Sequence, residues 1–252
     1  MSSRLSGKTA LVTGATSNIG RAIALAFGRE GAQVAVHGRD EARAAAVVAE
    51  IRAAGGRADA VILDLDGSVQ SARRLADEAM RRLGHVDILV NNAGIYPAPD
   101  TPGTDEATFD QVMAVNVKAP FFLVGALAPA MVRRGGGVIL NLGSWITRLG
   151  VPVGALYTST KGALEALTKA WASEFGAAGV RVNAISPGVV HEPSATVLPG
   201  DVMMRGTPAG THLPPDSIGQ AAVYLASDEA RFVHGVVLDV DGGRTSVAVV
   251  QG

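Results

Sequence analysis

The chain has 252 residues, of which 48% are hydrophobic and 4% aromatic, and its formal net charge is −1. This balanced charge, without long basic runs, argues against a nucleic-acid partner. The chain contains no cysteine, which excludes disulfides and thiolate metal sites, and its five histidines lack a ligand-like spacing, so no metal is expected. No long uncharged apolar segment is present, which predicts a cytoplasmic location and no membrane partner.

Short β-branched runs alternate with longer amphipathic segments, as in strands joined by helical crossovers. Strands are predicted at 9–12, 33–36, 59–63, 87–90, 137–142, 180–185 and 236–240, and helices at 19–30, 41–54, 68–83, up to about 134, and at 157–176. Right-handed crossovers place helices on both faces of a mostly parallel sheet. We therefore predict an α/β fold, a single doubly wound domain over residues 1–252.

The segment 188–214 interrupts this alternation. It contains Pro193, Pro199, Pro208 and Pro214 and few periodic apolar positions. A long segment without regular structure in a compact domain often covers a binding site. We expect a lid over a substrate here.

A glycine-rich turn follows the first predicted strand and opens a helix, with the sequence Thr13-Gly14-Ala15-Thr16-Ser17-Asn18-Ile19-Gly20. Backbone amides at a helix N-terminus, free of side-chain bulk, are suited to a diphosphate. Taken alone, the segment fits an ordinary tight turn equally well.

This turn resembles the TGxxxGxG motif of the short-chain dehydrogenase/reductase family, with Asn18 in place of the second glycine. Asparagine tolerates a left-handed backbone and offers its own amide. The family's other motifs follow in order: Asp64-Leu65, Asn91-Asn92-Ala93-Gly94, Asn116, Ser144, Tyr157-xxx-Lys161 and Pro187-Gly188. Each motif alone could be a turn or a local contact, but their order and their positions at predicted strand ends argue against coincidence.

The resemblance implies a Rossmann-type sheet and an NAD(P)-dependent oxidoreductase that moves hydride between a nicotinamide cofactor and a carbonyl or alcohol. The residues that it assigns to the cofactor are Gly14, Thr16, Ser17, Asn18, Ile19, Gly20, Arg39, Asp64, Leu65, Asn92, Ala93, Gly94, Tyr157, Lys161, Pro187, Gly188 and Val190.

Tyr157 and Lys161 are four residues apart on a predicted helix and therefore lie on one face. Reduction of a carbonyl needs a proton donor, and a phenol with a pKa of ~10 needs a neighbouring cation to work reversibly at neutral pH. By resemblance, Tyr157 is the general acid/base, Lys161 also binds the nicotinamide ribose, Ser144 polarises the substrate oxygen and Asn116 supports a water relay. The surroundings of Ser144 do not form a nucleophile elbow, so a serine hydrolase is not expected.

The second predicted strand ends at His37-Gly38-Arg39. An acidic residue here would bond the ribose hydroxyls and repel a 2′-phosphate, whereas Gly38 and Arg39 favour NADP(H). NAD(H) stays possible, because Arg39 could instead face water near Asp40 and Glu41. His37 could join a phosphate site or have a structural role.

After Pro187-Gly188, many relatives have a threonine that contacts the nicotinamide amide. Glu192 stands in that region here, and Ser194 or Thr196 could take the role instead. By resemblance, the substrate cleft is edged by Tyr96, Trp145, Ile146, Leu149, Val189 and Val190, with Arg148 and His191 as polar candidates. Trp145 and Leu149 fit plain core packing equally well.

We expect a small-molecule carbonyl or alcohol as substrate. The alternatives are an enzyme resembling the 3-oxoacyl-carrier-protein reductases, for which Arg133-Arg134 could supply a basic patch, and a dinucleotide-binding regulatory protein without catalysis. Helices around 109–134 and 155–178 resemble the family's interface helices. They predict a homotetramer that buries the apolar tail 247–250.

Overall fold

The computed structural model describes residues 3–97, 100–152, 154–192 and 198–248. Within them, seven parallel strands form one sheet in the order β3-β2-β1-β4-β5-β6-β7. The order reverses beside β1, because β1 pairs with both β2 and β4. The predicted doubly wound α/β fold is confirmed.

The strands and helices lie close to their predicted positions. The strands are β1 (Thr9–Val12), β2 (Gln33–Gly38), β3 (Arg57–Ile62), β4 (Ile88–Asn91), β5 (Gly137–Leu142), β6 (Val180–Pro187) and β7 (Val237–Val240). The α-helices are α1 (Asn18–Arg29), α2 (Glu41–Ala53), α3 (Val69–Leu83), α4 (Glu106–Met113), α5 (Ala119–Arg133), α6 (Ala155–Phe175) and α7 (Pro215–Ala226). We did not predict α7, whose sequence lies beside the proline-rich segment.

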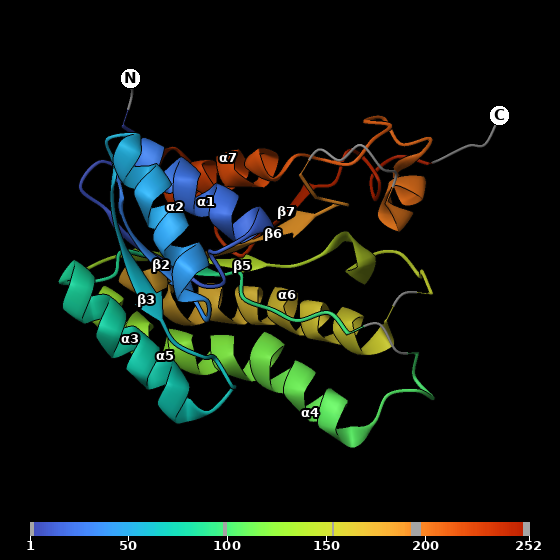
Figure 1. Ribbon diagram of the computed structural model, residues 1–252, viewed down its shortest axis with the longest axis horizontal. Helices are drawn as coiled ribbons and strands as arrows, with labels where there is room; N and C mark the ends of the chain where they lie inside the picture. Colours follow the sequence, from blue (N-terminus) through green and yellow to red (C-terminus); the bar gives the residue numbers. More distant parts are fainter. Residues whose placement is uncertain (1–2, 98–99, 153, 193–197, 249–252) are drawn as a thin grey trace.

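Helices cover both faces of the sheet. Figure 1 shows α1, α2 and α7 above it and α3, α5 and α6 below it. Successive strand side chains point to opposite faces, so Val34 and Val36 pack toward the first group of helices, while Ala35 packs toward the second. Burial on both faces explains why the strands are nearly continuous apolar runs.

Short polar side chains define where several helices begin. Asp40 accepts a hydrogen bond from the amide of Arg43 at the start of α2, and Ser68 accepts one from Ser71 at the start of α3. Such caps satisfy amides that have no partner within the helix. The caps fix the points at which the chain leaves β2 and β3, and therefore shape the edge of the cleft described below.

The helical run Glu106–Arg133 combines α4, a π-helical segment η1 (Ala114–Lys118) and α5. By length and composition alone, this run is apolar enough to cross a membrane. Leu123, Leu127 and Met131 on its inner face are fully buried against the sheet. Core packing therefore accounts for the apolar character of this inner face.

Candidate active site

The carboxyl ends of the strands border a cleft of about 590 Å³. Most of the predicted cofactor residues line it, namely Gly14, Thr16, Ser17, Asn18, Ile19, Gly20, Arg39, Asp64, Leu65, Asn92, Ala93, Gly94 and Tyr157. Parallel sheets bind ligands at this edge, next to the point where the strand order reverses. The structure therefore brings together residues that are up to 143 positions apart in the chain, from Gly14 to Tyr157.

The turn between β1 and α1 adopts the backbone expected of it. Gly14 has φ 62°, and Asn18, with φ 43°, is the one non-glycine residue with a positive φ in the described part of the chain. A Cβ at Gly20 would lie 2.2 Å from the carbonyl oxygen of Gly14, so no larger residue fits there. The turn thus keeps the open N-terminus of α1 free of side-chain bulk, which fits a diphosphate group.

Thr13 and Asn92 fasten this turn to the end of β4. The Thr13 hydroxyl accepts from the amides of Asn92 and Ala93, at 3.0 Å each, and donates to the carbonyl of Val90 at 3.0 Å. The Asn92 side chain donates to the carbonyls of Thr13 at 2.8 Å and Gly14 at 3.0 Å. The Asn92 amide therefore holds the turn in position from behind. The motif includes Thr13, but its contacts with β4 were not predicted.

His37 has a structural role behind the same turn. Its Nδ1 accepts from the amide of Gly14 at 3.3 Å, so Nε2 carries the proton and donates to the carbonyl of Leu63 at 3.0 Å. The ring is buried, and burial lowers the pKa of His37 to about 4. Histidine here is neutral and connects β2 to the turn, rather than forming a charged phosphate site.

This buried neutral imidazole predicts sensitivity to acid. Between pH 6.5 and 4 the unfolded chain binds a proton at His37 that the folded chain does not, so stability falls as the pH decreases through this range. From pH 7 to 5 the lowered pKa corresponds to a loss of about 2 kcal/mol. In His37→Asn, the free energy of unfolding from denaturant titrations should fall by that much less on acidification. An equal fall in both proteins would contradict the assignment.

Arg39 follows β2 at the rim of the cleft and is 72% exposed at its side chain. Its Nη1 lies 3.8 Å from a carboxylate oxygen of Asp64. An ion pair this long and this exposed is weak, so the guanidinium remains able to bind a ligand. Arg43, which sequence reasoning missed, lines the same cleft one helical turn later, near Asp40. A Cβ at Gly38 would lie 2.3 Å from the methyl group of Thr16, so an acidic side chain at this position would need Thr16 to move.

Tyr157 lies near the start of α6, at the inner end of the cleft. Its ring meets that of Tyr96 edge to face, with centroids 4.6 Å apart. Burial, with a smaller contribution from Tyr96, raises the pKa of Tyr157 to about 12. The surrounding chain therefore holds the phenol protonated, and lowering its pKa depends on a cation near the oxygen.

Lys161 is buried one turn further along α6, and its ammonium lies 5.5 Å from the centroid of the Tyr157 ring. Lys161 Nζ donates to the carbonyl of Leu142, at the end of β5, at 2.8 Å. Burial lowers the pKa of Lys161 to about 8, against an opposing effect of Glu165. The amine is therefore still charged at neutral pH, and its proton is easily lost or regained.

Ser144 follows β5 and is buried beside a 3-10 turn formed by Trp145–Thr147. Thr147 donates to its backbone carbonyl, but the Ser144 hydroxyl has no hydrogen-bond partner among the described residues. The same holds for the Tyr157 hydroxyl, so both remain available to a substrate oxygen.

Asn116 lies in η1 and is buried. Its side-chain amide donates to the carbonyl of Ile95 at 2.9 Å and to Thr160 Oγ1 at 3.2 Å, while its oxygen accepts from the amide of Ile95 at 2.8 Å. Asn116 thus ties the segment after β4 to α6. π-Helical turns often occur at functional sites, but the period of the apolar residues did not reveal this one.

The chain after β6 closes the far side of the site. Gly188 approaches Asp241 so closely that a Cβ would lie 2.8 Å from its Cα. The carbonyl of Val190 accepts from the side chain of Asn18 at 3.4 Å. The Glu192 carboxylate faces Arg21 on α1 at 3.8 Å, and Ser194 and Thr196 lie outside the described residues. Pro187 is the last residue of β6.

The expected substrate side is only partly open to a ligand. Trp145 and Ile146 are buried, which matches the packing alternative for Trp145, whereas Tyr96 is 52% exposed. Arg148 pairs with Asp239 and lies 3.8 Å from Glu165, so its charge is already balanced. The His191 imidazole contacts Asp201, as described below.

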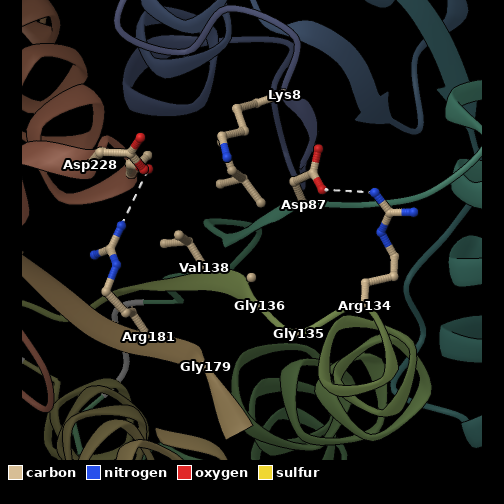
Figure 2. Close-up of a pocket in the computed structure, with 12 residues that line it drawn as sticks. Lys8, Asp87, Arg134, Gly135, Gly136, Val138, Gly179, Arg181 and Asp228 are labelled. Carbon is tan, nitrogen blue, oxygen red and sulfur yellow. Dashed lines mark hydrogen bonds and ion pairs between the residues drawn. The ribbon is translucent and has the colours of Figure 1, made fainter. Parts of the chain in front are cut away.

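A second charged cavity, of about 350 Å³, lies at the opposite, amino end of the strands. Figure 2 shows Arg134 directed at Asp87 on one side, and Arg181 on the other. Arg181 donates to the carbonyls of Leu225, Ala226 and Ser227 at the end of α7. Arg134 and Arg181 therefore contact other parts of this chain and have a structural role.

Comparisons with known proteins agree with this geometry. A family model described as enoyl-(acyl carrier protein) reductase matches residues 14–245. The 2,5-dichloro-2,5-cyclohexadiene-1,4-diol dehydrogenase LinX of Sphingobium indicum is 39% identical, over 96% of this chain and 98% of its own. The 3-oxoacyl-(acyl-carrier-protein) reductase FabG of Thermotoga maritima is 32% identical, over 95% and 98%.

The structure is similar to that of a gluconate 5-dehydrogenase from Burkholderia cenocepacia J2315 in complex with NADP and tartrate. The TM-score is 0.89 at 34% identity, covering 98% of each chain. The chain belongs to the short-chain dehydrogenase/reductase family. It is an NAD(P)-dependent oxidoreductase that acts on alcohol or carbonyl substrates.

Proposed function

We propose that Tyr157 is the proton donor and acceptor of this enzyme and that Lys161 controls its charge. The observation that carries the proposal is the buried Lys161 ammonium, 5.5 Å from the Tyr157 ring centroid. When bound, the nicotinamide cofactor supplies or accepts the hydride. Tyr157 gives its proton to the substrate oxygen, Ser144 orients that oxygen by a hydrogen bond, and Lys161 stabilises the phenolate.

Asn116 is proposed to support a proton relay to Lys161 indirectly, by fixing the backbone around Ile95 and Thr160. The cleft suits the cofactor because Gly14, Gly20 and Gly94 line it without side chains. A Cβ at Gly14 or Gly20 would collide with the backbone of Ala93 or Gly14, so this close packing of the turn requires glycine. The direct test is a screen with NADPH and NADH against ketones, quinones, acyl thioesters and keto sugars. The absorbance of the reduced nicotinamide reports the turnover. Binding of a cofactor without turnover of any class would favour a regulatory protein.

We propose a preference for NADP(H) over NAD(H). Arg39 and Arg43 both line the cleft at the end of β2, and an arginine fork fits a phosphate group in two-point contact. Asp64 is the acidic neighbour of Arg39, but at 3.8 Å and 66% exposed it leaves the guanidinium free to turn toward a ligand.

Arg39→Asp should weaken NADPH binding by about 10- to 100-fold more than NADH binding, because it removes a charge-assisted bond and adds repulsion. Cofactor affinities from fluorescence titration provide the measurement. Arg57→Asp is the control, because it changes the net charge by the same amount at the start of β3, whereas the cleft lies at the carboxyl ends of the strands. Equal losses for both cofactors would remove the main support for NADP(H).

A free small molecule is the proposed substrate. The carrier-protein alternative relied on Arg133-Arg134, but Arg134 lies at the amino end of β5, beside Asp87, opposite the cleft.

We propose that residues 1–252 act as one domain in which the described parts of 188–214 border the substrate. A cytoplasmic location stays a prediction.

We propose a homotetramer. An apolar groove of about 920 Å³ runs between α5 and α6, lined by Val117, Phe121, Phe122 and Leu167 among others, and Phe121 is 47% exposed. An exposed apolar surface of this kind favours self-association. Light scattering at micromolar concentration should give four chains, and Phe121→Glu should lower the mass. A wild-type monomer would refute the proposal; the tail residues 249–250 lie outside the described chain.

A further inference from the structure

Two histidines and an aspartate meet in the segment that follows β6. His191 comes directly after the strand extension at Val190, Asp201 lies in the 3-10 helix η4 (Pro199–Met204), and His212 precedes α7. Backbone pairing places the first and last of these segments side by side, because Leu213 bonds to both Val189 and His191. In Figure 1, η4 is the orange helix beyond β6 and β7.

One atom of each side chain points to a common position. His191 Nε2 lies 2.7 Å from Asp201 Oδ1, and His212 Nδ1 lies 3.2 Å from the same oxygen. The two imidazole rings are stacked with centroids 3.7 Å apart, and the three ligand atoms lie within 4.8 Å of one another. Ligands of a tetrahedral zinc ion, at about 2.0–2.2 Å from it, lie about 3.3–3.6 Å apart. The His212–Asp201 separation is close to this value, and His191 Nε2 would have to move about 0.6 Å or more away from Asp201 Oδ1 to admit the ion.

The remaining polar atoms of two of these residues are already held by the backbone. His191 Nδ1 contacts the carbonyl of Glu192 at 2.8 Å, and Asp201 Oδ2 accepts from the amide of Leu198 at 2.8 Å. Metal-binding histidines typically donate their second ring nitrogen to a carbonyl, which fixes the tautomer and leaves the other nitrogen for the ion. His191 already has this orientation, with Nδ1 at a carbonyl and Nε2 directed toward Asp201.

We propose that His191, Asp201 and His212 form a binding site for a divalent transition metal such as Zn²⁺. Two imidazole nitrogens and one carboxylate oxygen suit zinc, whereas magnesium and calcium prefer oxygen ligands. All three side chains are partly exposed, so water or another ligand can complete the coordination. The spacing in the sequence concealed this site, because its ligands lie 10 and 11 positions apart.

A bound ion would link η4 to the two segments that are paired at Val190 and Leu213. It would hold η4 against the chain around Val190, which in turn contacts Asn18 at the cofactor turn. The expected effect is on the stability of this region. The simpler alternative, a His–Asp ion pair without metal, would explain His191 but leaves the second histidine on the same oxygen unexplained.

The test is isothermal titration of Zn²⁺ into the full chain without a polyhistidine tag. We expect one ion per chain, and a rise in the thermal midpoint of about 5–10 °C at zinc concentrations 100-fold above Kd. His212→Ala and Asp201→Asn should each weaken binding by at least about tenfold, the lower end of the loss expected when the surroundings of a metal are disturbed.

His85→Ala is the matched control, since His85 also pairs with an aspartate, Asp87 at 3.1 Å, but has no second histidine beside it. It should bind zinc like the wild type. If zinc does not bind, or if Asp201→Asn and His212→Ala bind it unchanged, the cluster is an ion pair and the proposal fails. Asp201→Asn keeps the shape of the side chain, so the test survives if His212→Ala does not fold.

Discussion

Tyr157→Phe should lower kcat by at least about 100-fold, the lower end of what a positioned acid or base contributes. The substitution removes one oxygen and keeps the ring, so the edge-to-face contact with Tyr96 remains. Cofactor affinity should change little. Steady-state kinetics together with a cofactor titration separate the two effects.

Tyr224→Phe is the matched control, because Tyr224 lies on α7 and is partly exposed. It should retain wild-type turnover. If Tyr157→Phe kept more than about a tenth of wild-type turnover, the phenol would not be the acid, and the proposed mechanism would be wrong even though the fold and family stand.

Lys161→Ala should lower turnover by a similar factor and also weaken cofactor binding, because the same ammonium is proposed to stabilise the phenolate and to contact the ribose. This combined loss distinguishes it from Tyr157→Phe. Lys169→Ala, two turns further along α6 and exposed, is the control. Retained cofactor affinity in Lys161→Ala would contradict the ribose contact.

The pKa of Lys161 adds a dependence on pH. Burial lowers this pKa from 10.5 to about 8, so the ammonium exists below pH 8 and is lost as the pH rises through it. Cofactor affinity should therefore decrease above pH 8 in the wild type. In Lys161→Ala this step should be absent, and a profile with the same step would assign it to another group.

The sequence predicted the architecture well, because β-branched strands such as Val34–Val36 alternate with amphipathic helices and are buried on both faces. It did not reveal α7, since Pro214, directly before its start, was interpreted as the end of an irregular segment. Proline in fact begins this helix, where its missing amide costs nothing.

The candidate site was predicted residue by residue from motifs. The motifs could not show which residues would contact a ligand and which would hold the backbone of the site in place. Asn92, Asn116 and His37 are engaged with backbone groups of this chain. Such contacts depend on which strands become neighbours. For the same reason the contacts of Thr13 with β4, and the cluster of His191 with Asp201, had no local signal in the sequence.

Asn18 has a consequence for the turn that precedes α1. A glycine would reach φ 43° as one of many conformations, whereas asparagine has fewer accessible backbone states and can also bond to Val190. Much of the conformational entropy of this turn is therefore lost when the protein folds and not when a phosphate arrives. The turn is preorganised, and less of the binding free energy is consumed in ordering it.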